Sequence, residues 1–432
     1  DGGALPASSY GYATAAFAPG SDAGALLADI KGAIDRAVQN GIPAEMVEAA
    51  RRHEIADAEY EKNSIAGLAA VWSQAVAVEG RRSPDDYVAA VRNVTAEDVN
   101  RVARAYLKND TAVTALLTPR PSGMPVSSKG FGGKESFAPQ ETKPAELPAW
   151  AAKAGAVPPL PVSKVKPVVA DLSNGIRLIV QPVSISRSVN VIGKVKNNDD
   201  LEEPVGREGV SDMLGSLFSY GTTSLDRLAF QKAQDDIAAD ITAGLSFSLK
   251  VPSDHFERGM ELLAQNLLRP ALPESAFAVV QQEMIGSLRG QRLSPSYLST
   301  RALREALYPG NDPVLRDATP ESVATLSLQE VKAYYAKAFR PDMTTIVIIG
   351  NITPERARTA VDTYFGDWKA AGAKPATDLP PVPPNRPAVS LVPDASSVQD
   401  QVTLAATIGR TRTHPDYARL QLGNHVLSGA FY

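Results

Sequence analysis

Residues 94–99 read Val-Thr-Ala-Glu-Asp-Val, and residues 326–331 read Leu-Ser-Leu-Gln-Glu-Val. Both stretches are capping boxes, in which a hydroxyl residue, Thr95 or Ser327, begins a helix and an acid three residues later binds back to its backbone N–H. Each box also has an apolar residue on either side of the helix start, and a β-rich segment follows each helix. The two boxes lie 327 − 95 = 232 residues apart.

A second pair of helix boundaries has almost the same separation. Pro43 and Pro273 each interrupt two helical runs, and they lie 273 − 43 = 230 residues apart. Because the two spacings agree within two residues, in the same order of helix, turn, helix, cap and strand, the sequence predicts a duplication of about 230 residues. The helices are grouped and the strands lie at the edges of the groups, so we expect α+β layers.

Apolar periodicity places the individual elements. Leu26, Ile30, Ile34 and Val38 recur every four residues, which predicts a helix that Gly41 ends. A second helical pattern covers residues 43–78, and helical patterns also occupy much of 208–340. Strands are expected at 111–118, 175–180, 189–195, 344–350 and 401–408, with a hairpin turn at Asn174-Gly175 and a further helix at 416–427.

The composition describes a globular chain. Of the 432 residues, 44% are hydrophobic and 21% are charged, which excludes an intrinsically disordered protein, and no apolar run reaches the ~18 residues of a membrane span. With 44 basic and 48 acidic residues the net charge is −4, so the charge balance gives no footprint for nucleic acid. The absence of cysteine excludes disulfides, a thiolate nucleophile and a cysteine-type zinc site.

Two proline-rich segments divide the chain. Ten of the 33 prolines lie between Pro119 and Pro167, which is typical of an extended linker. The segment 130–135 within it resembles a phosphate loop, but it lacks the first glycine and has no Ser or Thr after its lysine. We expect domains at 1–120, 168–372 and 388–432, with a linker at 121–167 and a joint at 373–387. The start at Asp1 without Met and the apolar run at the end indicate a fragment or a processed product.

A search for catalytic groups finds none in a recognisable arrangement. The four histidines, His53, His255, His414 and His425, have no second histidine at metal-ligand spacing. Charged neighbours of His53 predict a solvated, ion-paired helix face, and His425 is expected to be packed or capping. There is no Gly-x-Ser-x-Gly elbow for a serine nucleophile.

Residues 209–222 read Gly-Val-Ser-Asp-Met-Leu-Gly-Ser-Leu-Phe-Ser-Tyr-Gly-Thr. This stretch resembles the active-site helix of the pitrilysin/insulinase family of zinc peptidases, the inverzincins, whose motif is His-x-x-Glu-His. The resemblance aligns Gly209, Gly221 and Thr222 with the frame of that motif. It places Asp212 and Ser216 at the two histidines and Gly215 at the glutamate, so the three chemical positions are degenerate. The third ligand of the family would fall near Gly286 or Ser287, close to Glu283.

Other segments extend the resemblance over most of the chain outside the linker. Residues 172–177 resemble the opening strand of the family's module, residues 350–355 a strand exit, and residues 416–429 the start of the next module. Residues 7–120 resemble the back end of the preceding module. The fold that this implies is a series of repeated two-layer domains, each an antiparallel-rich sheet with helices on one face, as in pitrilysin and the mitochondrial processing peptidase.

The resemblance also implies a function. The chain would hold most of a second domain, the linker, a complete inactive third domain and the start of a fourth. It would have no catalytic or metal-binding residues of its own, and zinc would belong to the full-length parent. Its expected partners are the catalytic half or a paired subunit and an unfolded peptide, with no nucleic acid and no membrane span.

Two other functions remain open. The chain could be a structural, non-peptidase subunit like the core proteins of respiratory complexes, or an independent peptide-binding module. A further alternative treats the linker and the fourth-domain segment as debris of proteolysis. The compartment is undetermined, although relatives with two halves often carry export signals.

Overall fold

A computed structural model describes residues 2–5, 8–15, 17, 21–117, 165–393 and 401–428. The chain forms two compact units. The first comprises Asp1–Thr118, Pro167–Ser294 and Tyr308–Val382, and the second comprises Pro119–Lys166, Pro295–Leu307 and Pro383–Tyr432. Most of the predicted linker, including the segment 130–135, lies outside the described residues. The predicted domain boundaries remain a prediction.

The N-terminal part of the first unit is a short hairpin followed by helices. Its elements are β1 (Gly2–Leu5), β2 (Ser8–Gly11), α1 (Ala23–Asn40), α2 (Ala44–Glu61), α3 (Ile65–Ser73), a π-helical turn (Gln74–Val78), α4 (Pro84–Arg92) and α5 (Ala96–Tyr106). The capping box at Thr95 is confirmed. The helical pattern predicted over 43–78 is interrupted at 62–64, where the Ser64 hydroxyl caps α3 by accepting the Gly67 N–H.

The rest of the first unit is built on a six-stranded sheet. Its strands are β3 (Val168–Asp171), β4 (Arg177–Pro182), β5 (Ser188–Val195), β6 (Asp240–Thr242), β7 (Ser246–Pro252) and β8 (Thr344–Gly350), and their order is β3-β4-β8-β5-β7-β6. Only β4 and β8 pair in parallel, and the other pairs are antiparallel. The strands predicted at 175–180, 189–195 and 344–350 and the turn at Asn174-Gly175 are confirmed.

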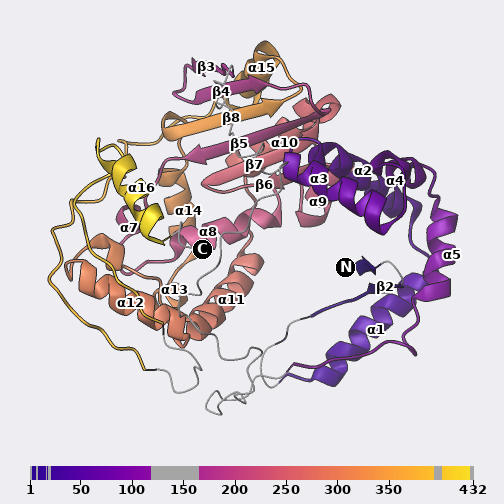
Figure 1. Cartoon of the computed structure of the whole chain (residues 1–432), viewed down its shortest axis with the longest axis horizontal. Coiled ribbons are helices and arrows are strands. Elements are labelled where there is room, and N and C mark those ends of the chain that lie inside the picture. Colours follow the sequence, from indigo (N-terminus) through magenta and orange to yellow (C-terminus); the bar gives the residue numbers. More distant parts are fainter. Residues whose placement is uncertain are drawn as a thin grey trace, which may run out of the picture. The chain divides into compact units, whose positions relative to one another are not determined.

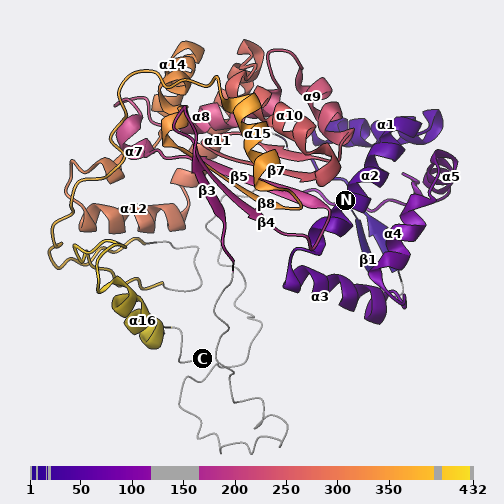
Figure 2. The ribbon, with the colours of Figure 1, turned by 90° about the horizontal axis from the view of Figure 1, so that it is seen from above.

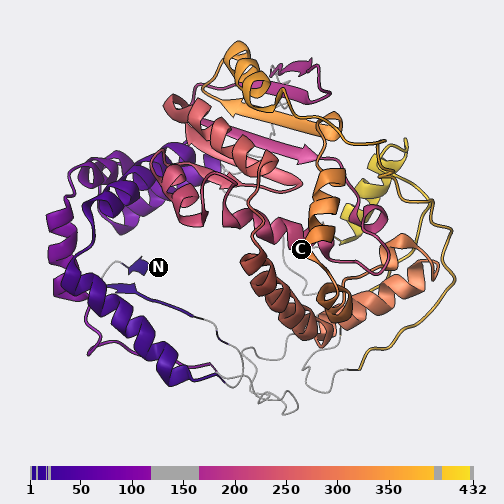
Figure 3. The ribbon, with the colours of Figure 1, turned by 180° about the vertical axis from the view of Figure 1, so that it is seen from behind.

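Helices cover one face of this sheet. They are α7 (Asp199–Glu202), α8 (Val210–Leu217), α9 (Arg227–Asp235), α10 (Phe256–Leu268), α11 (Glu274–Arg292), α13 (Pro320–Ala324), α14 (Leu328–Ala338) and α15 (Pro354–Phe365). α10 packs on β7 and α15 packs on β4, and both lie on the same side of the strands (Figures 2 and 3). The core between the layers is apolar and centred on buried residues such as Leu249, Met260 and Ile348.

Among the described residues, no such helical layer covers the opposite face of the sheet. Side chains alternate along β5, where Val191 is fully buried and Ile192 is 57% exposed. Gly193, opposite Phe247, leaves room for the aromatic ring, because a Cβ there would lie 2.0 Å from it. The α+β fold class, a two-layer unit with an antiparallel-rich sheet and helices on one face, is therefore confirmed.

Two predicted strands are wrong. Residues 111–117 are irregular, and Val113 is 99% exposed. Residues 401–408 are also irregular, although Asn385 and Thr407 exchange hydrogen bonds of 2.8 and 2.9 Å in the second unit. Both segments have strand-like composition, but a strand forms only where neighbouring strands accept and donate its backbone hydrogen bonds, and neither segment has such a neighbour among the described residues.

The second unit includes two helices, α12 (Pro295–Leu307) and α16 (Tyr417–Ser428), and α16 confirms the helix predicted at 416–427. No helix of the described chain has the length and apolar content needed to cross a bilayer.

Candidate functional site

The helix that carries the degenerate motif, α8, is held at its start by a carboxylate. Gly209 precedes the helix with φ of 97°, a conformation that favours glycine, and a Cβ there would lie 3.0 Å from Val323. The Glu203 carboxylate accepts the N–H groups of Gly209 at 3.0 Å and Ser211 at 2.9 Å. These are two of the amides that a helix start leaves without partners, so Glu203 fixes the position of α8.

The end of the motif is a tight turn. Gly221 has φ of 89°, and a Cβ there would lie 2.5 Å from the Leu225 carbonyl oxygen. The Thr222 hydroxyl accepts the N–H groups of Ser224 and Leu225 at 3.2 and 3.0 Å. The buried Asn266 donates to the Gly221 carbonyl at 3.2 Å. Gly209, Gly221 and Thr222 therefore shape the backbone around α8, which gives a physical reason for their presence in the frame.

The three degenerate positions lie on the outer side of α8. Asp212, Gly215 and Ser216 are all exposed, whereas Met213, Leu214 and Leu217 are buried in the core. The Ser216 hydroxyl donates to the Asp212 carbonyl at 3.0 Å, one turn back, so it is occupied within the helix. A Cβ at Gly215 would meet nothing within 4 Å, so the space outside the helix is open at this point.

The open space is a pocket of about 680 Å³. Its wall includes all three degenerate positions and three neighbours from α8 and the turn after it: Ser211, Leu214 and Phe218. The other lining residues come from β5, the segment 197–199, the start of β7 with the residue before it, and the residue after α14: Lys194, Asn197, Asp199, Leu245, Ser246 and Phe339. Phe218 packs against Phe339 with ring centroids 5.3 Å apart, which makes the base of the pocket rigid and apolar. The pocket therefore combines an apolar base with polar walls.

Acidic groups gather beside this pocket. Loss of hydration, and then repulsion by Asp199, raises the pKa of Asp212. Burial raises the pKa of Glu203 to about 7, against the two backbone hydrogen bonds that lower it. The Asp199 carboxylate accepts the Tyr334 hydroxyl at 3.0 Å. Glu203 thus changes charge near neutral pH at the start of α8.

These residues do not fit a zinc ion. A zinc site of this family type needs two imidazoles and a carboxylate on neighbouring helices, and the motif positions supply one carboxylate, one hydroxyl and no side chain at Gly215. α11 packs against α8, and its Glu283 is exposed, as are Gly286 and Ser287. Among the described residues there is no cluster of three His, Asp or Glu side chains that could hold a metal.

The histidines are scattered, and one expectation about them is wrong. His53 in α2 lies 3.2 Å from the Asp235 carboxylate, so its helix face docks on another part of the first unit and is only partly solvated. His414 accepts the Asp416 N–H at 3.1 Å, and His425 is exposed on α16, not packed as expected. Periodicity alone could not locate the α2 contact, because polar groups make it across about 180 residues of sequence.

Comparisons with known proteins agree with the motif. The family model described as "Peptidase M16 inactive domain" matches residues 325–432. The match covers 108 of the 432 residues, the C-terminal quarter of the chain. The predicted resemblance to the pitrilysin/insulinase zinc peptidases is thereby confirmed.

Two curated relatives carry the name YmxG. The first, "Uncharacterized zinc protease YmxG" of Bacillus subtilis, is 22% identical over 215 residues, which cover 48% of this chain and 52% of the relative. The second, "Non-peptidase homolog YmxG" of Helicobacter pylori, is 22% identical over 151 residues, 33% of this chain and 35% of the relative. The chain thus spans about half or less of the relatives that it matches.

The solved structures that resemble this chain include a peptidase M16 inactive domain from Pseudomonas fluorescens. It is 17% identical with a TM-score of 0.47, and the match covers 51% of this chain and 55% of that one.

Proposed function

We propose that this chain is a non-catalytic portion of an M16-type zinc metalloendopeptidase, which helps to enclose and bind an extended peptide. A catalytic half or a paired subunit would supply the zinc site. The observation that carries the proposal is α8, which keeps the glycine-threonine frame of the motif beside a 680 Å³ pocket and has no chelating set of side chains. The match to the M16 inactive domain supports the same role.

The geometry around the pocket supports contact with an extended peptide. Leu245 and Ser246 lie in its wall and join β6 to β7. β6 is the edge strand of the sheet and pairs only with β7. Some of the backbone N–H and C=O groups on its outer side can therefore form hydrogen bonds with a peptide strand added at this edge. One of them is already taken, because the Ile241 N–H donates to the Gln234 side chain at 3.1 Å. The apolar base at Phe218 and Phe339 would receive a side chain of the peptide.

We also assign residues 1–120 to the C-terminal part of a second peptidase-like domain, 168–372 to the inactive third domain and 388–432 to the start of a fourth. Pro43 precedes α2 and Pro273 precedes α11. Thr95 and Ser327 likewise precede α5 and α14, and both of these helices have 11 residues. The same order of boundaries in both copies supports the assignment.

The test uses the 432-residue chain and three measurements. We expect no stoichiometric zinc by elemental analysis, no chelator-sensitive cleavage of a quenched fluorescent peptide, and measurable binding of a labelled unstructured peptide by fluorescence anisotropy. Gly215→Trp fills the pocket, since no atom lies within 4 Å of a Cβ there, and peptide affinity should fall about tenfold or more. Gly290→Trp is the control, because Gly290 in α11 is equally unobstructed and lies outside the pocket wall.

Two results would contradict the proposal. Stoichiometric zinc with chelator-sensitive cleavage by the chain would overturn its non-catalytic role. If the Gly215→Trp and Gly290→Trp variants bind the labelled peptide with equal affinity, the α8 pocket has no role in peptide binding.

The second candidate function is a structural, non-peptidase subunit, which the name of the Helicobacter pylori relative favours. It differs from the first in that the partner would also lack His-x-x-Glu-His, and the chain would bind no peptide. The same anisotropy measurement therefore separates the two functions.

A further inference from the structure

A second cavity of the first unit lies away from the α8 pocket, between α2 and the sheet. It has a volume of about 780 Å³, which is within the range of small-molecule sites. One wall is α2, from Arg52 to Lys62, and the other is the loop 184–188 between β4 and β5. The segments that follow β7 and β8 contribute Asp254, His255 and Asn351.

Side-chain hydrogen bonds hold the two walls together. The Tyr60 hydroxyl donates to the Ala238 carbonyl at 3.0 Å. Asn63 donates to the Ser188 hydroxyl at 3.0 Å and accepts from the Ser186 hydroxyl at 2.9 Å. Ala238 has a positive φ of 48°, which is uncommon for a residue other than glycine and is found at functional sites. The cavity is therefore preformed.

The charge of the lining is positive. Four basic residues, Arg52, Lys62, Arg92 and Arg187, face two acids, Glu59 and Asp254, which gives 4 − 2 = +2 with His255 neutral. The whole chain carries −4, so the positive charge is local. Behind the lining, the Arg51 guanidinium pairs with Glu48 and donates to the Arg92 carbonyl at 3.2 Å, so it adds no net positive charge. A ligand for this cavity should carry negative charge.

Within the described residues two of the four cations have no ion-pair partner, although the Glu59 carboxylate attracts the charge of Arg187. Lys62 pairs with Glu59 at 2.6 Å, and the Arg52 guanidinium lies 3.6 Å from the Asp236 carboxylate. Within the part of the chain that the structure describes, the guanidinium groups of Arg92 and Arg187 form no hydrogen bond or ion pair. Each guanidinium presents a planar fork of donors, which matches the oxygens of a phosphate.

The remaining lining is apolar. Ile55 and Pro252 contribute hydrocarbon surface, and Ile185 is 67% exposed in the loop. Apolar walls beside two free guanidinium groups suit a ligand with a phosphate end and an apolar or planar body. We propose that this cavity is a binding site for a small organic phosphate, with Arg92 and Arg187 binding the phosphate. The proposal does not depend on the peptide-binding role of the α8 pocket.

Isothermal titration calorimetry on the full chain tests the site with pyrophosphate, adenosine triphosphate and citrate. We expect binding of both phosphates, tighter for the nucleotide because Ile185 and Ile55 contact its body, and at least tenfold weaker binding of citrate. Arg92→Gln and Arg187→Gln should each weaken phosphate binding about tenfold or more, and Ile185→Ser should weaken only the nucleotide.

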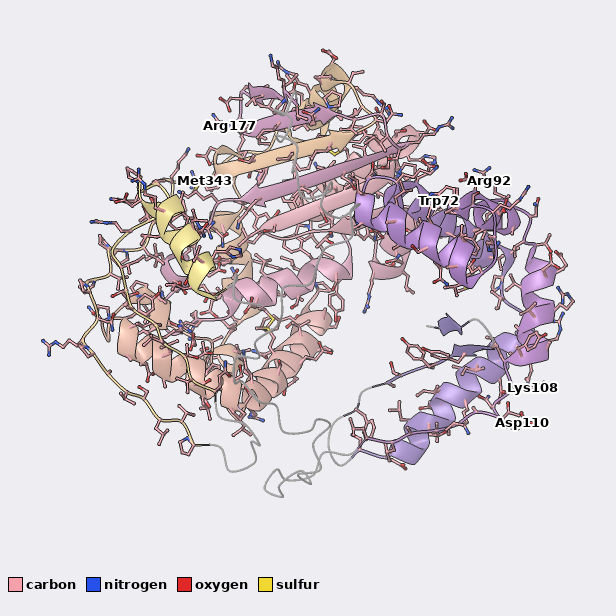
Figure 4. All side chains as sticks on the ribbon, viewed as in Figure 1. Trp72, Arg92, Lys108, Asp110, Arg177 and Met343 are labelled. Carbon is pink, nitrogen blue, oxygen red and sulfur yellow. The ribbon has the colours of Figure 1, made fainter. Side chains whose placement is uncertain are left out.

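The control is Arg177→Gln. Arg177 is an exposed arginine on β4, paired with Asp171 at 2.9 Å, and it lies far from Arg92 (Figure 4). The Arg177→Gln variant should bind pyrophosphate, adenosine triphosphate and citrate with the same affinities as the unmodified chain. Thermal melts of each variant verify folding, and bound nucleotide should raise the melting temperature of the unmodified chain. The proposal is overturned if the chain binds neither phosphate, or if it binds citrate as tightly as the phosphates. It is also overturned if pyrophosphate and the nucleotide bind with equal affinity, or if the Arg92→Gln and Arg187→Gln variants bind phosphate as tightly as the Arg177→Gln control.

Discussion

Burial strongly changes the chemistry of Glu203, the residue that holds the start of α8. Its pKa is raised to about 7 by burial, whereas an unfolded glutamate titrates near 4.5. Between these values the folded chain holds a proton that the unfolded chain has lost. The free energy of unfolding therefore falls as pH rises from about 5 to about 7, by roughly 2 kcal/mol once the partial exposure of Glu203 is allowed for.

Glu203→Gln removes this titration and leaves one acceptor for the start of α8. We expect the stability of the variant, relative to the unmodified protein, to increase between pH 5 and pH 8. Urea denaturation at pH 5, 6, 7 and 8 measures the difference. Glu283→Gln, at an exposed position of α11, is the control and should leave the profile unchanged. Parallel profiles for Glu203→Gln and the unmodified protein would contradict the prediction.

At the scale of elements, the two segments that we assign to the repeat differ in what covers their helices. α10 lies on the sheet and buries Phe256, Met260, Leu263 and Leu267, whereas α1, at the corresponding place in the first copy, has no buried residue. Figure 1 shows the strands beside α10, whereas the described residues of the first copy form a single small sheet, the β1–β2 hairpin. The apolar stripe of α1 is only half-buried because the described first copy has no broad sheet against it.

A matched pair of substitutions measures this difference. Met260→Ala should lower the free energy of unfolding by about 3 kcal/mol, because it empties a fully buried site, whereas Ile30→Ala on half-buried α1 should cost about 1 kcal/mol or less. Urea denaturation followed by circular dichroism compares the two. Equal costs would show that the α1 stripe is as well packed as the core of the third domain.

At the scale of the whole molecule, polar contacts join α2 to the sheet within the first unit. Tyr60, Asn63 and His53 bind groups 120 to 190 residues away in sequence. Because these are hydrogen bonds and not an apolar interface, each contributes only about 1 kcal/mol, and the contact is open to local loosening.

Asn63→Ala removes both bonds to the serines of the loop 184–188. We expect faster backbone hydrogen exchange in residues 184–188, measured by mass spectrometry, with unchanged exchange in β4 and β8. Asn93→Ala is the control, since the side chain of Asn93 donates only to the Ala89 carbonyl of its own helix. Exchange that spreads into β8 would mean that α2 stabilises the whole sheet and not only this loop.

The sequence alone determined the features that depend on neighbouring residues. The capping boxes at Thr95 and Ser327 begin helices, apolar segments rich in β-branched residues form β4, β5 and β8, and α8 has no chelating set of side chains. Each follows from local hydrogen bonding, from the period of the side chains or from residue identity. The repeat spacing is visible for the same reason, because helix boundaries are local signals.

Only the tertiary structure decided the features that depend on distant partners. The parallel pairing of β4 with β8 joins residues about 170 apart, and the segments 111–117 and 401–408 are irregular, with no strand of the described chain beside them. The docking of α2 and the two cavities also arise from contacts across the chain. A backbone segment with strand-forming residues becomes a strand only when its hydrogen-bonding groups meet a partner, and its own sequence does not contain that partner.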